Sequence, residues 1–327
     1  MNTSRLDLDP IKVVILKERL MLVKVVRKRN VEIIAWILVC LTLVAACGQT
    51  PADVVEPTIQ AEEDRAQPYF GLEFPSSTVS RFAPSNFNKE MHASPIFSPD
   101  GREVYWSWMG EPNGVWFMEI KDGSWTEPAK ASFDHVGQGD SPFISSDGSK
   151  LLYLSWSTSG SEVIRQVERE GGEWVSSHKL PNEVNQNGAH WQASMADNGN
   201  LYFGSEGKLY FSAFENGSYS SAEIMEISLN LDNGYDGSPF IAPDESYLIF
   251  DRGVNFSPVD LFITFRNEIG DWEKPVAMEE LNSEGNDLYA NVSPDGRFIM
   301  FLSNRAGGIL LPYWVDAGII EDYRPQN

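Results

Sequence analysis

Five ionisable side chains recur at one place in a repeated sequence pattern, and their types suit ligand binding. They are His92, Asp140, His190, Asp236 and Asp287, and each lies seven or eight residues before the aspartate of a recurring turn. If folding brings them together, three carboxylates and two imidazoles could hold a cation or a polyhydroxyl ligand. Oxygen ligands favour Ca²⁺ or Mg²⁺, whereas two histidines favour a transition metal. The alternative is a solvated set of polar side chains that bond backbone amides and order the loops.

The turn aspartates belong to five similar segments, spaced 47 to 51 residues apart. The segments are Ser94–Trp106, Ser141–Leu154, Trp191–Phe203, Ser238–Phe250 and Tyr289–Phe301, with turn residues Asp100, Asp147, Asp197, Asp244 and Asp295. We expect a short strand to enter a Pro-Asp-Gly turn and to leave on an apolar strand. Proline presets the first turn position, aspartate bonds the local backbone, and glycine accepts positive φ. Glu245 stands where the fourth copy should have glycine, so we expect that turn to close differently.

Two further strands follow each segment, so each period holds four. Third strands are expected at Val115–Ile120, Glu162–Val167, Lys208–Phe214, Asp260–Arg266 and Leu311–Asp316. Fourth strands are expected to begin at a turn followed by Trp125, Trp174, Tyr219 or Trp272, whose recurrence indicates packing. Four short strands per period of about 45–50 residues predict a propeller blade.

The fifth copy lacks its fourth strand, whereas an additional strand near Thr78–Ala83 precedes the first copy. We therefore predict an all-β, single propeller of five four-stranded blades, closed by this N-terminal strand. Closure of this kind leaves no unpaired edge at the seam. The alternative is six blades, with the extra blade built from Tyr69–Ser80 and Ile319–Pro325.

The five segments resemble the TolB-type, WD40-like propeller repeat, whose signature is Ser-Pro-x-Phe-Ser-Pro-Asp-Gly followed by an apolar strand. The resemblance covers about residues 69–325. It implies the fold but no single activity, because similar repeats occur in periplasmic TolB, in peptidase propeller domains and in envelope lipoproteins.

In a propeller the first strand of each blade lines the axis, so the resemblance places the five ionisable residues at the channel mouth. Near the same face we expect Trp106, Trp108, Trp156, Arg252 and Arg305. Aromatic rings beside carboxylates suit sugars or peptides. The alternative for Trp106 and similar residues is packing between blades.

The N-terminus has the pattern of a secretory signal. A basic cluster at residues 24–29 precedes 14 uncharged residues, Ile33–Ala46, whereas a transmembrane helix needs about 20. The run ends at Ala45-Ala46-Cys47, which resembles the lipobox of bacterial lipoproteins, in which the cysteine is lipidated and becomes the new N-terminus.

We therefore predict a signal peptide over residues 1–46, lipidation of Cys47, a flexible tether over 47–67 and the propeller over 68–327. Residues 1–20 are either part of a long N-terminal region of the signal peptide or the result of a mis-assigned initiation site, in which case translation starts at Met21. An uncleaved membrane anchor that contains Cys47 is the alternative to lipidation.

The charge excludes nucleic acid as a partner, because 47 Asp and Glu face 25 Lys and Arg, for a net charge of −22. Removal of residues 1–46 would take away eight basic and four acidic residues and leave a net charge of −26. Anionic lipid would repel such a chain, so the acyl chains must provide the anchoring.

Sequence motifs of catalysis are absent: there is no Gly-x-Ser-x-Gly, His-Glu-x-x-His, Walker or dinucleotide pattern. We expect a non-enzymatic, monomeric lipoprotein of the cell envelope that faces the periplasm or the cell exterior. It would bind or scaffold a protein or glycan partner, with Ca²⁺ or Mg²⁺ as the cofactor to consider. The alternatives are a glycan hydrolase that uses Asp140, Asp236 and Asp287, and a sensor whose ligand gates a partner.

Overall fold

The structure is a computed structural model that describes residues 66–110, 113–134, 138–156, 162–175, 177–186, 190–227, 234–255 and 258–325. The chain divides into two compact units, Met1–Ala61 and Glu62–Asn327, and all described residues belong to the second. Cys47, the predicted signal peptide and the tether up to residue 65 lie outside the described residues. Among the described residues, no helix combines the length and the apolar character needed to cross a membrane.

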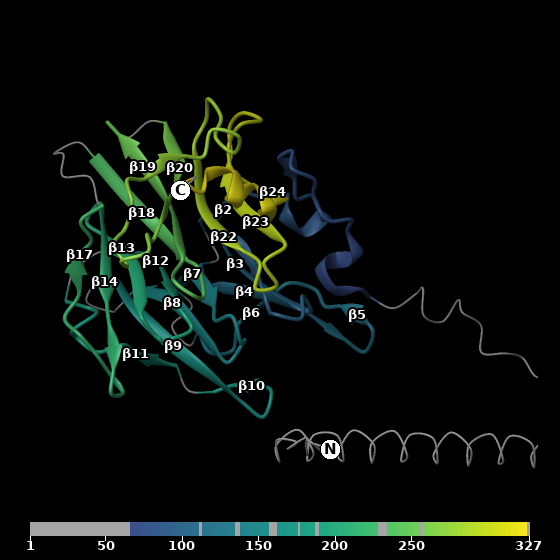
Figure 1. The fold of residues 1–327 in the computed structure, drawn as a ribbon. Coiled ribbons are helices and arrows are strands. Elements are labelled where there is room, and N and C mark those ends of the chain that lie inside the picture. The colour runs from purple at the N-terminus through teal and green to yellow at the C-terminus, as the bar shows by residue number, and fades with distance from the viewer. Residues whose placement is uncertain are drawn as a thin grey trace, which may run out of the picture. The chain divides into compact units, whose positions relative to one another are not determined.

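Antiparallel strands form five blades in chain order (Figure 1). Blade 1 contains β2 (Met91–Phe97), β3 (Glu103–Trp108), β4 (Val115–Lys121), β5 (Ser124–Trp125) and β6 (Ala129–Lys130). Blade 2 contains β7 (Gly139–Ile144), β8 (Lys150–Trp156), β9 (Glu162–Glu170), β10 (Glu173–Trp174) and β11 (His178–Lys179). Blade 3 contains β12 (His190–Met195), β13 (Leu201–Ser205), β14 (Lys208–Ser212) and β17 (Glu223–Ile224), with the hairpin β15 (Phe214–Glu215) and β16 (Ser218–Tyr219).

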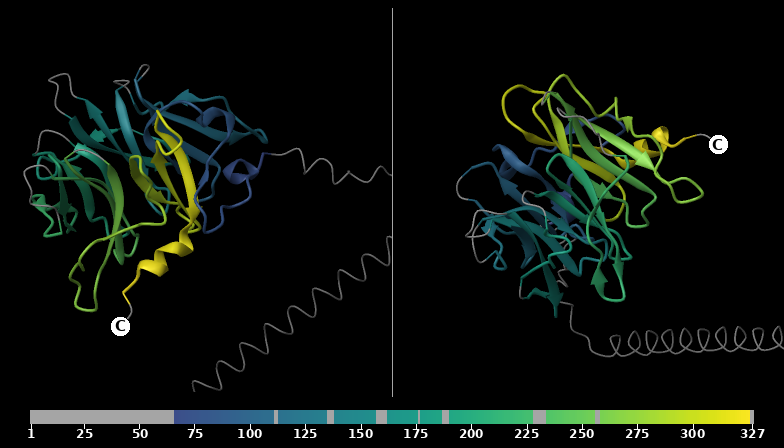
Figure 2. Two further views of the ribbon diagram at one scale, coloured as in Figure 1. Left: turned by 90° about the horizontal axis from the view of Figure 1, so that it is seen from above. Right: turned by 90° about the vertical axis from the view of Figure 1, so that its left-hand side faces the viewer.

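The last two blades complete the ring. Blade 4 contains β18 (Gly234–Ile241), β19 (Tyr247–Val254), β20 (Val259–Phe265) and β21 (Val276–Ala277). Blade 5 contains β22 (Asp287–Val292), β23 (Phe298–Ser303), β24 (Leu311–Asp316) and β1 (Ser80–Arg81). The first strands β2, β7, β12, β18 and β22 each contact the next around the axis, and β22 contacts β2. In both views of Figure 2 the yellow blade 5 accordingly lies beside the blue blade 1.

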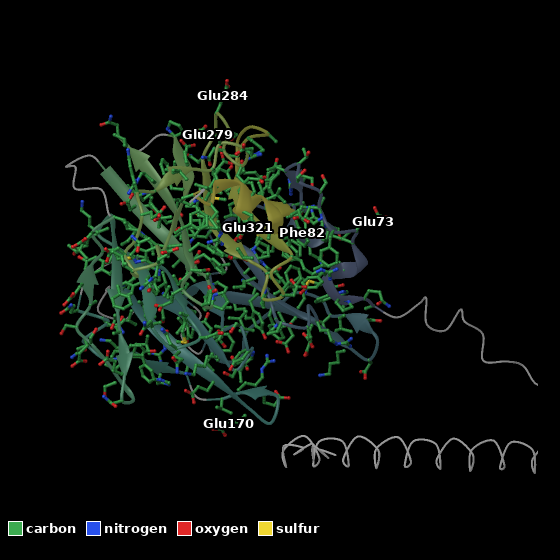
Figure 3. All side chains as sticks on the ribbon, in the orientation of Figure 1. Glu73, Phe82, Glu170, Glu279, Glu284 and Glu321 are labelled. Carbon is green, nitrogen blue, oxygen red and sulfur yellow. The ribbon has the colours of Figure 1, made fainter. Side chains whose placement is uncertain are left out.

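The N-terminal strand closes the ring as predicted. Ser80 pairs with Trp314 and Arg81 with Tyr313 on β24. Phe82, labelled in Figure 3, follows the strand. Its buried ring packs edge-on against Trp314, with 5.2 Å between the ring centroids. The segments considered for a sixth blade instead contain the 3₁₀ helices η1 (Pro68–Gly71) and η3 (Ala317–Tyr323), and η2 (Ser85–Phe87) follows β1. The count of five blades is therefore confirmed.

The outermost strand of blade 1 is split in two. Trp125 pairs with Ile120 at the far end of β4, and pairing resumes only at β6, where Lys130 faces Trp116. Pro128 lies between the two pieces, and proline cannot donate to a sheet ladder.

The recurring aromatic residues pack as expected. Trp125 stacks on Phe70 at 4.1 Å, and Trp174 donates its indole N–H to the Tyr105 hydroxyl at 2.7 Å. Tyr219 contacts Phe214 at 4.8 Å in blade 3. Ala66 and Gln67, at the end of the predicted tether, also bond to blade 1.

The expectation for the fourth turn is wrong, because this turn closes as the others do. The Glu245 N–H donates to the Ala242 carbonyl at 2.9 Å, as the Gly101 N–H does to Ser98 at 2.8 Å. Glu245 adopts φ +60°, close to the +67° of Gly101. Its carboxylate accepts hydrogen bonds from the Tyr202 hydroxyl at 2.5 Å and from the amides of Asn198 and Asn200 at 2.9 and 3.0 Å. Contacts across the boundary between blades 3 and 4 therefore hold a conformation that normally favours glycine.

Candidate functional site

Two of the five predicted ionisable residues are sealed inside their own blades. Asp236 is 0% exposed and forms a two-point ion pair with Arg252, at 2.7 Å to Nε and 3.1 Å to Nη2. Asp287 is also 0% exposed; Arg305 Nη2 lies 2.7 Å from Oδ1, and the Ser283 N–H and hydroxyl both donate to Oδ2 at 2.7 Å. Both carboxylates are neutralised by an arginine, and neither is open to a ligand.

His190 is buried as well. Its ring lies edge-on to Phe203 at 5.4 Å, and its backbone N–H donates to Glu162 Oε2 at 2.9 Å. Glu162 begins the third strand of blade 2 and was not among the predicted site residues. Its charge also acts on the remaining two members of the predicted set, His92 and Asp140.

Those two members, His92 and Asp140, meet across the boundary between blades 1 and 2. His92 Nδ1 contacts Asp140 Oδ2, and the Ser107 hydroxyl donates to Oδ1. The Ser141 N–H also donates to Oδ1, at 2.7 Å. The side chains of His92 and Asp140 are 37% and 15% exposed, so this pair is the part of the predicted set that meets solvent.

Electrostatics favour the protonated form of His92. Burial alone would lower the pKa of His92, but the hydrogen bond and charge of Asp140, with the charge of Glu162, outweigh it and raise that pKa. Burial raises the pKa of Glu162, and repulsion from Asp140 raises it further. His92, Asp140 and Glu162 therefore influence one another's charge.

A pocket of about 180 Å³ opens beside this pair; we call it the mouth pocket. Its lining includes His92, Trp108, Met109, Asn113, Gln138, Asp140 and Trp156. Trp156 is 46% exposed and Met109 is 45% exposed, so aromatic and thioether surface faces solvent next to charged groups. Of the aromatics expected at this face, Trp106 is instead fully buried and packs edge-on against Phe87 at 5.0 Å.

A β-bulge shapes the first strands where they face the axis. Pairing shifts register between Asp140 and Phe143 and between Leu288 and Asn291. Ser141 and Tyr289 take φ of +46° and +56° within these bulges, although non-glycine residues rarely adopt positive φ. The first strands of the other three blades also shift register, so the bulge is a shared feature of the repeat.

The opposite end of the axis is closed by apolar side chains. Every blade contributes to the lining of a small cavity of about 70 Å³ there, and its members include Ile96, Phe143, Met195, Phe240 and Val292. An open polar route through the propeller is therefore not favoured, and the mouth pocket is the better candidate site.

A buried carboxylate that the repeat alignment did not single out lies between blades 4 and 5. Asp251 is fully buried; it accepts hydrogen bonds from the Tyr235 hydroxyl at 2.9 Å and the Tyr289 N–H at 3.3 Å. Burial raises the pKa of Asp251 to about 6, although those hydrogen bonds favour the charged form. The signal in the sequence was a carboxylate directly after the apolar run Leu248–Phe250.

The part of the chain that the structure describes contains no group of three or more His, Cys, Asp or Glu side chains arranged to hold a metal ion. The physical reason at the channel mouth is that arginine already pairs with two of the three ring aspartates. The geometry therefore does not favour Ca²⁺ or Mg²⁺ at the ring.

Comparison with known proteins supports the fold and leaves the activity open. No protein-family model and no curated protein sequence matches the chain. Among solved structures, arabinanase Arb43A from Bacillus subtilis is similar, with a TM-score of 0.51, 14% identity, and coverage of 70% of this chain and 95% of that one.

TolB from Acinetobacter baumannii gives a TM-score of 0.42 at 15% identity, over 68% of this chain and 53% of that one, so the chain spans about half of that protein. A gluconolactonase from Xanthomonas campestris gives a TM-score of 0.44 at 9% identity, over 67% of this chain and 70% of that one. At 14% identity the likeness to Arb43A shows the fold alone.

Proposed function

We propose that the protein is a lipid-anchored binding propeller of the cell envelope, and that it takes one unit of a glycan into the mouth pocket. The observation that carries this proposal is the exposed Trp156 beside the pair of His92 and Asp140. An aromatic ring can stack on the apolar face of a sugar, while carboxylate, imidazole and amide groups bond its hydroxyls. The amides of Asn113 and Gln138 supply further donors and acceptors at the same pocket.

Binding is favoured over hydrolysis by the number of carboxylates available. Among the described residues that line the mouth pocket, Asp140 is the sole carboxylate. Glycoside hydrolysis ordinarily requires a pair, one as acid and one as nucleophile or base. Asp236 and Asp287, which could have completed such a set, are buried against arginines.

Envelope anchoring rests on the short apolar run that ends at Cys47. Labelling of the full chain in cells with a palmitate analogue tests it directly. Cys47→Ser should remove the label and leave the precursor uncleaved, whereas the control Cys40→Ser should keep both labelling and cleavage. Label that persists in Cys47→Ser would refute the anchor.

The binding proposal is tested on a glycan array with the full chain in mild detergent. Trp156→Ala should weaken the wild-type signal at least tenfold, and the glycans should be recovered uncleaved. Ile269→Ala is the matched control, because Ile269 is an exposed apolar residue (82%) of blade 4 outside the pocket. Loss of signal in both variants, or in neither, would contradict binding at the mouth pocket.

A further inference from the structure

We infer that a second pocket, between blades 2 and 3, binds a neutral sugar unit at a site separate from the mouth pocket. We call it the side pocket; its lining includes Lys150, Gln166, Glu168, His178, Phe214 and Tyr219. Its volume is about 400 Å³, within the range of about 300–1,000 Å³ that is typical of small-molecule sites. This site goes beyond the proposed function and does not depend on the mouth pocket.

One wall of the side pocket is a face of blade 2 that carries polar side chains. Lys150 on β8 is paired with Glu168 on β9, and Gln166 on β9 is paired with His178 on β11. Residues paired across antiparallel strands project to the same face, and so do residues two apart on one strand. The sheet therefore gathers an ammonium, a carboxylate, an amide and an imidazole on a single wall.

The opposite wall is a hairpin of blade 3, in which β15 and β16 form a two-stranded sheet of their own. Side chains take up backbone donors at its base: the Ala213 N–H donates to Ser220 Oγ at 2.9 Å, and the Phe214 N–H donates to Asn200 Oδ1 at 2.8 Å. The hairpin contributes Phe214 and Tyr219, whose ring centroids lie 4.8 Å apart, to the lining of the pocket. An aromatic ring can cover the apolar face of a sugar.

The amide of Gln166 lacks a donor that a ligand could supply. Gln166 is only 6% exposed, and its Nε2 donates to Glu168 Oε1 at 2.9 Å. Its Oε1 is buried too and has no hydrogen-bond partner within the part of the chain that the structure describes. Buried polar atoms of native proteins normally have a partner, because an unpaired one is costly. A sugar hydroxyl in the side pocket would donate the missing hydrogen bond.

The charges that line the side pocket balance one another. Two lysines, Lys150 and Lys179, match two glutamates, Glu168 and Glu183. Lys150 Nζ also lies 6.0 Å from the ring centroid of Phe214, within the range of a cation–π contact. A cationic ligand would meet the two lysines, and an anionic ligand would approach against the net charge of −22. A neutral ligand rich in hydroxyls fits both these charges and the unpaired acceptor.

The two pockets lie at opposite ends of β8. Lys150 begins this strand of seven residues at the side pocket, and Trp156 ends it at the mouth pocket. At about 3.3 Å per residue, the two ends are separated by roughly 20 Å. Each site can therefore be disabled while the other is left intact.

The test measures the Kd of methyl glycosides by saturation-transfer NMR, with the full chain at pH 7.5 in a detergent that contains no sugar. The neutral probes are the methyl glycosides of glucose, galactose and N-acetylglucosamine. The charged probes are those of glucuronic acid and glucosamine. At least one neutral probe should bind at least tenfold more tightly than both charged probes. Trp156→Ala should keep this binding, because Trp156 lies at the far end of β8.

Two variants locate the binding. Ser218→Trp places an indole in the side pocket from an exposed position on β16, and it should weaken binding of the neutral probe at least tenfold. Ser124→Trp is the matched control, because Ser124 is exposed at the same place in the corresponding hairpin of blade 1, outside the pocket. Gln166→Leu removes the unpaired oxygen with little change in size. It should also weaken binding at least tenfold, with Tm measured in parallel to show that the variant folds.

The outcomes separate this site from the mouth pocket. Full binding by Ser218→Trp or Gln166→Leu, or an equal loss in Ser124→Trp, would overturn the inference. Binding that Trp156→Ala abolishes would overturn it as well and support the mouth pocket instead. Tighter binding of either charged probe would overturn the preference for a neutral sugar. A wild type that binds none of the probes would overturn the side pocket as a sugar site, and the glycan-array test of the mouth pocket would be unaffected.

Discussion

Removal of the carboxylate of Asp236 should strongly destabilise blade 4. Asp236 is fully buried, and its loss leaves the Arg252 guanidinium, itself only 13% exposed, without its counter-charge. Breaking a buried ion pair on one side costs about 3–5 kcal/mol. The remaining partners of Arg252 are the Ile227 carbonyl at 2.9 Å and the rings of Phe250 and Phe262 at 5.0 and 5.1 Å. They do not replace a carboxylate.

We therefore expect Asp236→Ala to lower the free energy of unfolding by about 3–5 kcal/mol. For a domain of this size each kcal/mol shifts Tm by about 2–4 °C, so Tm should fall by roughly 6–20 °C. Urea and thermal unfolding of the full chain, followed by circular dichroism, measure both quantities. The double variant Asp236→Leu, Arg252→Met should lose less stability than Asp236→Ala, because no buried charge is left unpaired.

His92→Ala is the comparison at the mouth pocket. This side chain is 37% exposed, and solvent can screen Asp140 after its loss, so we expect a cost of about 0–1 kcal/mol. Equal stability losses in Asp236→Ala and His92→Ala would refute the division of the predicted ring into sealed and open members. A double variant less stable than Asp236→Ala would refute the charge argument.

Three further perturbations test other parts of the fold. Asp251→Asn should raise the free energy of unfolding at pH 7.5 by up to about 3 kcal/mol and change it little at pH 4. The reason is that burial raises the folded pKa of Asp251 to about 6, above the unfolded value, so the wild type loses stability as pH rises from about 4 to 6. Thermal melts of both proteins across that range measure the effect. A difference in Tm between the two proteins that does not change with pH would contradict it. Glu245→Ala should lower the free energy of unfolding by about 2–4 kcal/mol, because three hydrogen bonds are lost. Glu245→Gly should lower it by about 1 kcal/mol less, because glycine adopts φ of +60° without strain. Equal stability of the two variants in urea unfolding would disprove the strain. Phe82→Ala should lower the free energy of unfolding by about 3–5 kcal/mol and expose the edge of β24, which promotes aggregation. Thermal melts and light scattering measure the two effects. An unchanged Tm and a monodisperse sample would count against closure through this segment.

The repeat pattern was sufficient to predict the architecture. Turns of the Pro-Asp-Gly type are local, because proline and glycine set their own backbone angles whatever surrounds them. Two copies have the full Pro-Asp-Gly sequence, around Asp100 and Asp295, and the other three keep the turn aspartate. Five turns at regular spacing therefore predicted five blades. The absence of a fourth strand after Leu311–Asp316, with an additional strand before the first repeat, predicted closure by β1.

One local detail could not be predicted because distant residues decide it. Glu245 accepts a glycine conformation only because Tyr202, Asn198 and Asn200 of blade 3 hold its carboxylate.

For the candidate site, the sequence by itself determined only that the five ionisable residues occupy equivalent places in their repeats. Only the tertiary structure decided their surroundings: Arg252 and Arg305 seal Asp236 and Asp287, whereas Asp140 meets His92 at an open pocket. The repeat sets position along a strand, but ion pairing and solvent access depend on which residues from other strands come within a few ångströms. These contacts join segments far apart in the chain, so a local pattern does not encode them.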